Sequence, residues 1–452
     1  MSDRIEGFTH SVMLQEDKCK GCTNCIKRCP TEAIRVHKGK ATIINERCID
    51  CGECIRACPH GAKHAVTDSM DMLKKFKYCV AIPAPALYSQ YRSARSRNHI
   101  LTALKKLGFD DVFEVALGAE VVSNATRQFI RETDIPGPVI STACPAVVRL
   151  IQVRFPNLID RMLPLAAPVE VAAEMARNRA LKNTKLRPEA IGIFFISPCA
   201  AKMHSKYWPS RGSVSNIDAI ISFQDIYMKL RESIKSLPEE AEEEYAEATV
   251  FGVRWANPGG ESLALNINKF LAVDGINEVV KILETVENSD KFEDVDFLEA
   301  LACTGGCLGG ALTVKNPFFA QIIMKSMRSE AKGKFQVADL PLQEIDYKDI
   351  LWDKQLEHVP IHQLDSDIMR AMEKLENMEQ ITDELPGLDC GACGAPNCRA
   401  FAEDVVRGEA MLTDCIFKLR ERVRDLAVEM YELENMHPPT LEHGNEKSEN
   451  KK

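Results

Sequence analysis

Two copies of one cysteine pattern near the N-terminus place the strongest constraint on the fold of this 452-residue chain. The first copy reads CKGCTNCIKRCP and starts at Cys19, and the second reads CIDCGECIRACP and starts 29 residues later at Cys48. Three cysteines on one tight loop can hold three irons of a 4Fe–4S cube, and the fourth cysteine of each copy ligates the cube of the other copy. The pattern therefore predicts two cubes with crossed ligands.

These eight cysteines divide into two ligand sets. Zinc is the alternative metal, but it usually takes pairs of Cys-x-x-Cys without a third and fourth cysteine. The segment resembles bacterial two-cluster ferredoxins, and the short apolar runs Ala33–Val36 and Ala41–Ile44 suit their small strands. The expected first set is Cys19, Cys22, Cys25 and Cys58, and the expected second set is Cys48, Cys51, Cys54 and Cys29.

Composition limits the setting in which the 17 cysteines act. The formal net charge is −9 and the pI is about 5.7, which argues against a nucleic-acid footprint and against a polybasic membrane anchor. The sequence shows no secretory signal and no apolar run of transmembrane length, so we expect a cytoplasmic protein with no membrane and no nucleic-acid partner. Thiols stay reduced in the cytoplasm, and clustered cysteines then indicate metal rather than disulfides.

Residues 78–360 alternate strand-like and helix-like segments, which is typical of an α/β domain with a parallel sheet. Helical patterns cover Asn98–Leu107 and Pro168–Lys182. The acidic run Glu239–Glu247 is interpreted as a solvated loop or helix face rather than a docking site. The strand candidates are Cys79–Ile82, Val112–Val115, Val139–Ser141, Ala190–Ile196 and Ala219–Ser222.

Four cysteines of this region lie in three separated motifs. Isolated cysteines are often buried core residues, and that is our interpretation of Cys79, which opens an apolar strand. The prolines and glycines around the other four favour metal binding, because glycine lets the backbone approach a cofactor closely. The motifs are STACP with Cys144, ISPCAAK with Cys199 and Lys202, and LEALACTGGCLGGAL with Cys303 and Cys307.

The three motifs resemble, in order, the signature loops of the FeFe-hydrogenase large domain, which also follows a ferredoxin domain in that family. The flanking text AIPAPAL and FEVALGAEVV and the stretch Gly137–Met175 are similar as well. The resemblance implies an H-cluster, in which a 4Fe–4S cube is joined through one cysteine sulfur to a diiron unit. That unit bears carbon monoxide, cyanide and an azadithiolate bridge.

The resemblance also implies roles for particular residues and partners. We expect H2 and protons as substrates, a redox partner such as ferredoxin or a signalling partner, and hydrogenase maturation proteins. Lys202 matches the lysine that donates a hydrogen bond to a cyanide ligand. The cube ligands carried over are Cys144, Cys199, Cys303 and Cys307, of which Cys307 bridges to the diiron unit.

Several loop positions depart from the family pattern. Ala143 replaces the cysteine that passes protons to the bridging amine, and Ser205 replaces a glutamate three residues past the lysine. Ser197 and Leu301 replace two methionines. A positioned proton carrier typically contributes ~10²–10⁴-fold, so we expect slow turnover, and the pattern is similar to sensory FeFe-hydrogenases. His204 is a substitute proton carrier in one interpretation, although a surface or hydrogen-bonded role is preferred.

A second cysteine-rich module lies near the C-terminus, in LDCGACGAPNCRAFAEDVVRGEAMLTDC. A glycine-rich hairpin is expected to supply three thiolates, and a helix to return the fourth. This segment resembles the small 4Fe–4S domain of electron-transfer and corrinoid-linked proteins. A zinc site is the alternative to a 4Fe–4S cluster. Helical pattern continues from Ala400 to about Asn435. The expected ligands are Cys390, Cys393, Cys398 and Cys415, so that four cubes use every cysteine except Cys79.

The sequence thus predicts a multidomain α/β protein. We expect an α+β two-cluster ferredoxin domain in 1–77 and a hydrogenase large domain with parallel sheets in 78–362. A linker helix and a small helical 4Fe–4S domain follow in 363–436, and a disordered tail in 437–452.

Three functions fit this organisation. The first is a slow, reversible hydrogenase acting as a hydrogen or redox sensor; the second is a metabolic ferredoxin-linked hydrogenase; the third is a non-enzymatic iron–sulfur relay without the diiron unit. Ala143 argues against the second, and Lys202 with the intact CTGGCLGG argues against the third. The sequence NPGGES at Asn257–Ser262 fits the family's Gly-Gly stretch near the active site better than a phosphate-binding loop.

The last helical segment carries apolar residues at alternating spacings of three and four, which indicates a coiled-coil seam. Packing of this stripe on the chain's own hydrogenase domain is slightly preferred, and a homodimer or partner interface is the alternative. Fewer than three heptads make an isolated pair marginal. The seam consists of Ile416, Leu419, Val423, Leu426, Met430 and Leu433.

Overall fold

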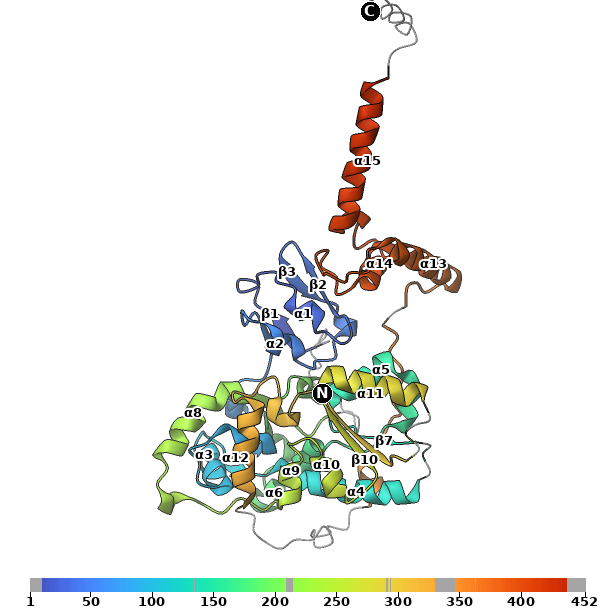
Figure 1. Cartoon of the computed structure of the whole chain (residues 1–452). Helices are drawn as coiled ribbons and strands as arrows, with labels where there is room; N and C mark the ends of the chain where they lie inside the picture. The colour runs from blue at the N-terminus through green and yellow to red at the C-terminus, as the bar shows by residue number, and fades with distance from the viewer. Residues whose placement is uncertain are drawn as a thin grey trace, which may run out of the picture.

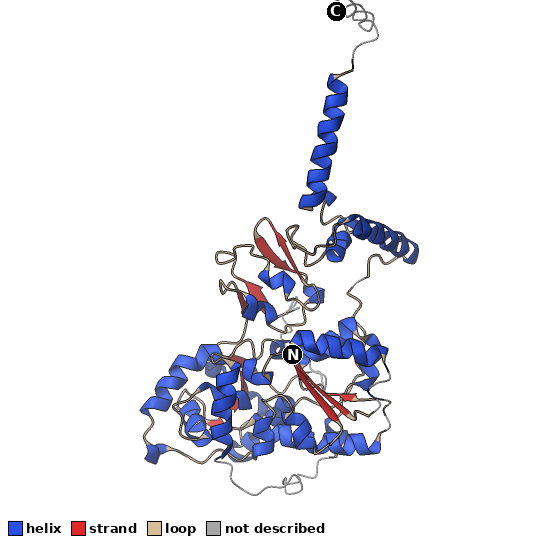
Figure 2. Ribbon diagram, viewed as in Figure 1, coloured by secondary structure: helices blue, strands red, loops and turns tan. Residues whose placement is uncertain are grey.

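The computed structural model describes residues 10–436 except 134, 136, 209–213, 290, 291, 293, 330–345 and 362. A large α/β body carries a small domain with short strands, and the last helix projects away from both (Figures 1 and 2). The tail expected to be disordered lies outside the described residues. Within the described part of the chain, no helix combines the length and the apolar character needed to cross a membrane.

The small N-terminal domain repeats one unit twice. Strand β1 (Val12–Leu14) pairs antiparallel with β4 (Lys63–Ala65), and β2 (Ile34–His37) pairs antiparallel with β3 (Lys40–Ile43). The repeat is visible in the backbone, because left-handed residues recur at the same 29-residue spacing: Gly21 with Asp50, Thr23 with Gly52, and Glu32 with Gly61. Each unit carries a short helix that contains its third cysteine, α1 (Asn24–Lys27) and α2 (Glu53–Ala57).

Two parallel sheets form the frame of the large domain. The four-stranded sheet has the order β6-β5-β8-β9, and the three-stranded sheet has the order β10-β11-β7. All pairs in both sheets are parallel, which confirms the predicted fold class. The strands are β5 (Tyr78–Pro83), β6 (Asp111–Val112), β7 (Val139–Ile140), β8 (Ile191–Ser197), β9 (Ala219–Ser222), β10 (Phe270–Asp274) and β11 (Phe297–Leu301).

Helices cover these sheets. All seven residues of β8 are buried, as expected for a central parallel strand with both faces covered. Helices α4 (Val115–Glu132) and α6 (Pro168–Thr184) approach each other closely at Gly118. A Cβ at that position would lie 2.3 Å from the carbonyl oxygen of Pro168. The longer helices are α3 (Arg97–Lys105), α4 (Val115–Glu132), α5 (Pro145–Arg154), α6 (Pro168–Thr184), α8 (Phe223–Ser236), α11 (Ile276–Asn288) and α12 (Pro317–Ser329).

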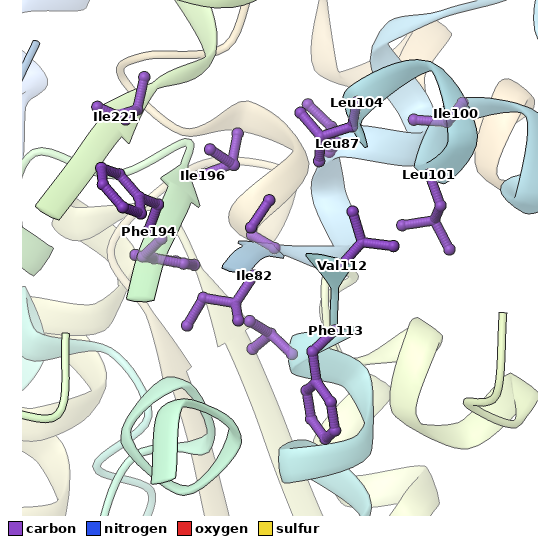
Figure 3. Close-up of a cluster of buried hydrophobic side chains, with 14 of the residues drawn as sticks. Ile82, Leu87, Ile100, Leu101, Leu104, Val112, Phe113, Phe194, Ile196 and Ile221 are labelled. Carbon is purple, nitrogen blue, oxygen red and sulfur yellow. The ribbon is translucent and has the colours of Figure 1, made fainter. Parts of the chain in front are cut away.

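The main core lies around the four-stranded sheet. Figure 3 shows Ile82, Phe194 and Ile221 from three adjacent strands, with Leu101 and Leu104 approaching from α3. Cys79 belongs to the same core, and its thiol donates a hydrogen bond to the carbonyl of Leu73 at 3.4 Å. The interpretation of Cys79 as a core residue is confirmed.

Some sequence-based boundaries were wrong. The expected strand Val112–Val115 ends at Val112, and Val115 already begins α4. Strands β10 and β11 were missed. The acidic run begins as the short 3-10 helix Glu239–Ala241 and continues as a loop. It is not purely solvated, because Glu242 accepts hydrogen bonds from Arg95 and Ser96. The side chain of Asn98 accepts hydrogen bonds from the backbone amides of residues 245 and 246. The side chain of Glu114 accepts hydrogen bonds from those of residues 247 and 248.

The C-terminal module consists of α13 (Ile368–Glu384), α14 (Cys398–Val406) and α15 (Ile416–Glu434) around its own small core. The predicted continuous helix is interrupted at Gly408, whose φ of +78° lies in the left-handed region. The preferred packing of the seam on the hydrogenase domain was wrong: helix α15 has no buried residue. It extends away from the body instead (Figure 1).

Candidate functional site

The four central cysteines meet at one cavity of about 110 Å³. Three of the loops that carry them follow the carboxyl ends of parallel strands, where ligand sites of α/β sheets form. Cys144 follows β7 and caps α5, Cys199 follows β8, and Cys303 follows β11. Cys307 lies four residues further, in the short helix Gly306–Gly309. The cavity therefore lies where the two sheets bring three distant loops together.

Glycines in the third loop allow this close assembly. Gly306 has a φ of +65°, and a Cβ there would lie 2.9 Å from the carbonyl oxygen of Ala256. A Cβ on Gly310 would lie 2.4 Å from the carbonyl oxygen of Pro198, next to Cys199. Side chains at these positions would push the third loop away from its neighbours. The glycines in CTGGCLGG are thus needed for the cavity itself.

Lys202 lines the cavity, and its ammonium group donates a hydrogen bond to the carbonyl oxygen of Ala143 at 3.1 Å. That contact joins the first and second loops. The methyl side chain of Ala143 also lines the cavity and offers no proton. Leu301 lines it too, whereas Ser197 is buried beneath the second loop, and its hydroxyl accepts a hydrogen bond from the Cys199 amide at 3.1 Å.

A second, larger cavity of about 960 Å³ lies on the other side of Lys202. Ser205 and His204 line this second cavity and not the first. The imidazole of His204 stacks on Trp208, with ring centroids 4.6 Å apart. The candidate carrier His204 and the substituted position Ser205 therefore line a different cavity from the cysteines, and Lys202 lines both cavities.

Two buried glutamates in the first cavity were missed as functional residues. Glu261 accepts a hydrogen bond from Ser141 at 2.6 Å, and Glu299 accepts from the amides of Gly259 and Ser262 at 2.9 Å each. Burial, reinforced by the charge of Glu299, raises the pKa of Glu261 well above its usual range. Burial also raises the pKa of Glu299. The carboxylate of Glu299 occupies the place where an anion would bind NPGGES, which excludes a phosphate loop there.

The sequence offered a signal for Glu261, which lies inside the glycine-rich segment that flanks the site. Glu299 is an isolated acid in the apolar strand β11, and this could not be recognised as a signal before β11 was known.

Two of the central thiols have strongly raised pKa values. Burial raises the pKa of Cys199 to about 12, and the neighbouring Cys303 and Cys144 add to the rise. Burial likewise raises the pKa of Cys307. Four thiolates around one cavity would repel one another, and a bound metal cluster compensates that charge when it displaces the protons. The donor set and the mostly apolar lining fit an iron–sulfur cluster with an attached small group beside Lys202.

The other twelve predicted ligands form three further groups of four. Cys19, Cys22, Cys25 and Cys58 line one small cavity; Cys29, Cys48, Cys51 and Cys54 line a second; Cys390, Cys393, Cys398 and Cys415 line a third. The structure thus brings Cys58 to the first N-terminal loop and Cys29 to the second. No metal ligand beyond a cysteine was predicted for these sites.

One arginine connects the N-terminal domain to the central cavity. Arg56 donates a hydrogen bond to the sulfur of Cys303 at 3.2 Å, and Glu53 holds the same guanidinium at 2.7 Å. Gly52 lies against the third loop, because a Cβ there would lie 2.4 Å from the side chain of Ala311. The cysteine set that contains Cys51 and Cys54 therefore lies next to the central cavity.

Buried ion pairs attach the C-terminal module to the N-terminal domain. Arg35 binds Asp404 through two hydrogen bonds of 2.5 and 2.9 Å, and Arg47 binds Glu403. Although burial raises the pKa of Glu403, the hydrogen bond and charge of Arg47 hold it below its usual value. The Val36 amide also donates to the carbonyl of Gly394 at 2.9 Å. These contacts were not predicted, since nothing in the sequence links residues more than 350 positions apart.

The fold and the four cysteine sets define a multidomain iron–sulfur protein, and comparison with known proteins identifies its family. Residues 77–266 and 261–311 match the iron only hydrogenase large subunit, C-terminal domain. The chain belongs to this family. Residues 11–59 match a 4Fe–4S dicluster domain, and residues 385–417 match a family of Fe–S cluster segments.

The individual relatives are distant. The periplasmic [Fe] hydrogenase large subunit of Nitratidesulfovibrio vulgaris is 26% identical over 361 residues, covering 67% of this chain and 86% of the relative. Iron hydrogenase 1 of Clostridium pasteurianum is 24% identical over 254 residues, covering 47% of this chain and 44% of the relative. An FeFe-hydrogenase structure from work on oxygen inactivation is 14% identical with a TM-score of 0.50, covering 65% of this chain and 97% of that one.

These comparisons establish a hydrogenase-like iron–sulfur protein related to FeFe-hydrogenases. The ligand assignments and the cytoplasmic location stay predictions.

Proposed function

We propose that this chain catalyses slow, reversible H2 oxidation and proton reduction and acts as a hydrogen or redox sensor. One observation carries the proposal: the cavity combines four cysteines and Lys202 with Ala143 at the position of the family's proton-passing cysteine. An H-cluster held by these cysteines would supply the cleavage and formation of H2. Lys202 would donate a hydrogen bond to its cyanide ligand, as an ammonium group does strongly to an anion.

Proton supply distinguishes this cavity from that of a fast enzyme. Ala143 carries no exchangeable proton on its side chain, and Ser205 lies in the other cavity. Glu261 and Glu299 remain as the carboxyl groups inside the first cavity. Burial raises the pKa of both groups, that of Glu261 well above its usual range, which favours the protonated form of Glu261 near the cysteines and makes release of its proton to water unfavourable. This balance supports turnover that is slow rather than absent.

The contacts between the cysteine sets support one order for electron transfer. The set with Cys51 lies next to the central cavity through Arg56 and Gly52. The other N-terminal set shares its small cavity with Val36, which binds the C-terminal module at Gly394. Electrons would then pass between the central site, the two N-terminal clusters and the C-terminal cluster in that order. Cys390 is exposed, so a redox or signalling partner would exchange electrons at the C-terminal module.

The proposal is tested on protein matured anaerobically. We expect infrared bands of metal-bound carbon monoxide and cyanide, together with slow H2 production. Ala143→Cys should raise the rate, and adding Ser205→Glu should raise it further only if the second cavity can also deliver protons. Wild-type turnover near ~10³ s⁻¹ would identify a metabolic enzyme instead. Loaded iron–sulfur clusters without the infrared bands would identify an electron relay.

A further inference from the structure

Helix α15 is left without a surface to pack against. Its base is fixed to the C-terminal module, where Phe417 joins the module's core and Lys418 lies 3.8 Å from Glu384. Beyond that base, the helix extends away from the rest of the described chain (Figure 1). An isolated helix of this length is marginal in water, and most helical stability comes from packing of an apolar face. The helix therefore needs a partner surface.

The six residues of the seam are all exposed, by between 41% and 70%. They are Ile416, Leu419, Val423, Leu426, Met430 and Leu433. Alternating spacings of three and four place them on one face of the helix, as at the a and d positions of a two-stranded coil. The partner surface should therefore be another helix with the same apolar repeat, and a second α15 has that repeat.

Two charged residues decide the direction of pairing. Arg422 and Glu429 border the same edge of the seam, and their side chains lie 3.6 Å apart, both more than half exposed. When two copies run antiparallel with Val423 of one facing Leu426 of the other, Arg422 of each copy faces Glu429 of the second copy, and the two symmetric pairs lie on the same edge of the seam. A parallel pair would instead bring Glu429 towards Glu434 of the second copy. Charge complementarity thus favours the antiparallel arrangement.

We propose that α15 is a dimerisation helix that pairs antiparallel with α15 of a second copy of this chain. All six apolar layers are filled in this register: Ile416 with Leu433, Leu419 with Met430, and Val423 with Leu426, each occurring twice. The helix has 19 residues and is about 28 Å long. The two C-terminal cysteine sets therefore lie at opposite ends of the pair, and each chain keeps its own electron path.

Sedimentation equilibrium of anaerobic, full-length holoprotein tests the pairing. Wild type should show a reversible monomer–dimer equilibrium, and Leu426→Glu should shift it to the monomer with an unchanged cluster absorption spectrum. Arg422→Glu and Glu429→Lys should each weaken dimerisation by roughly tenfold, because each replaces two favourable exposed pairs with two repulsive ones. The double variant should recover the wild-type dissociation constant.

Each alternative predicts a different pattern. A parallel pair would be strengthened by Glu429→Lys and unaffected by Arg422→Glu, which would overturn the proposed direction. A monomer at every concentration would overturn pairing with a second copy and leave a helix of another protein as the occupant. A dimer that survives Leu426→Glu would show that a different surface holds the copies together.

Discussion

In the C-terminal module, the four cysteines lie between residues 390 and 415, whereas those of the central cavity come from three loops between residues 144 and 307. The module's cysteines lie on one short loop and at the N-terminal ends of α14 and α15, so its ligand set is local in sequence. The central site exists only when two parallel sheets bring their carboxyl ends together. Similar ligand sets can thus depend on the fold to very different degrees.

The difference determines what a substitution should disturb in each region. At the central cavity the sheets fix the positions, so a change in a lining residue should alter chemistry more than structure. At the C-terminal module the chemistry is local, while the attachment rests on a few ion pairs between distant residues. A change there should alter attachment and electron exchange and leave the central site intact.

Lys202→Met should give the largest effect on activity, confined to the central site. The Lys202 ammonium group is a hydrogen-bond donor at the wall of the cavity. Removing one preorganised donor from an active site typically lowers the catalytic rate by ~10²–10³-fold. We expect the four cubes to load while the infrared bands of the diiron unit disappear or H2 production falls by that factor. Lys206→Met is the matched control, because Lys206 lies on the same helix but pairs with Asp68 at 2.7 Å. Unchanged bands and activity in Lys202→Met would refute its assigned role.

Asp404→Asn should disturb attachment of the C-terminal module instead. The Asp404 and Arg35 side chains are only 4% and 3% exposed, and leaving one member of a buried ion pair without its partner costs roughly 3–5 kcal/mol. Hydrogen exchange of the α14 amides should accelerate accordingly, while the infrared bands of the central site stay unchanged. The exposed Asp383 provides the control, since Asp383→Asn should change stability by less than about 0.5 kcal/mol. Equal protection of α14 in both variants would contradict the attachment role.

Regions whose ligands lie close together in the sequence were easier to predict than regions assembled from distant segments. The N-terminal sets could be predicted from spacing alone, because the same four-cysteine pattern occurs twice, 29 residues apart. The central strands β5, β8 and β9 could be found because they are continuous apolar runs. Strands β10 and β11 were missed, since FLAVD and FLEAL each place an acid among the apolar residues. In β11 that acid is Glu299, which the fold buries at the cavity.

Contacts between distant segments could not be predicted at all. Arg56 and Arg35 look like ordinary charged residues of a ferredoxin domain, and only the packing of domains gives them Cys303 and Asp404 as partners. The exposed seam of α15 was recognised as a seam, but its environment was wrongly assigned. Periodicity identifies an apolar face and does not identify what covers it.

Glu261→Gln should give a smaller, pH-dependent change in stability. The raised pKa of Glu261 means that the folded chain holds a proton that the unfolded chain releases above about pH 4.3. Stability from this group is therefore lost as pH rises towards the raised value, by at most ~1.4 kcal/mol per pH unit. The apparent unfolding midpoint of the glutamine variant should match wild type near about pH 4.3 and exceed it increasingly as the pH rises above that value. The exposed Glu189, changed to glutamine, should show no such trend, and a constant difference at all pH values would contradict the raised pKa.

Arg56→Gln should give the smallest effect, at the point where the N-terminal domain meets the central cavity. The guanidinium donates to the sulfur of Cys303, and its positive charge stabilises the more negative, reduced form of a cluster bound there. Removing the charge should lower the reduction potential of the central cube by roughly 50–100 mV, which corresponds to about 1–2 kcal/mol for one electron. The measurement is a redox titration of the central cube's spectroscopic signal. Arg28→Gln is the matched control, because Arg28 also binds Glu53, at 3.3 Å, but is 62% exposed and has no hydrogen bond to a central cysteine. If both variants shift the potential equally, the effect comes from Glu53 or from general charge; a shift confined to Arg56→Gln would establish that this contact electrically couples the two regions.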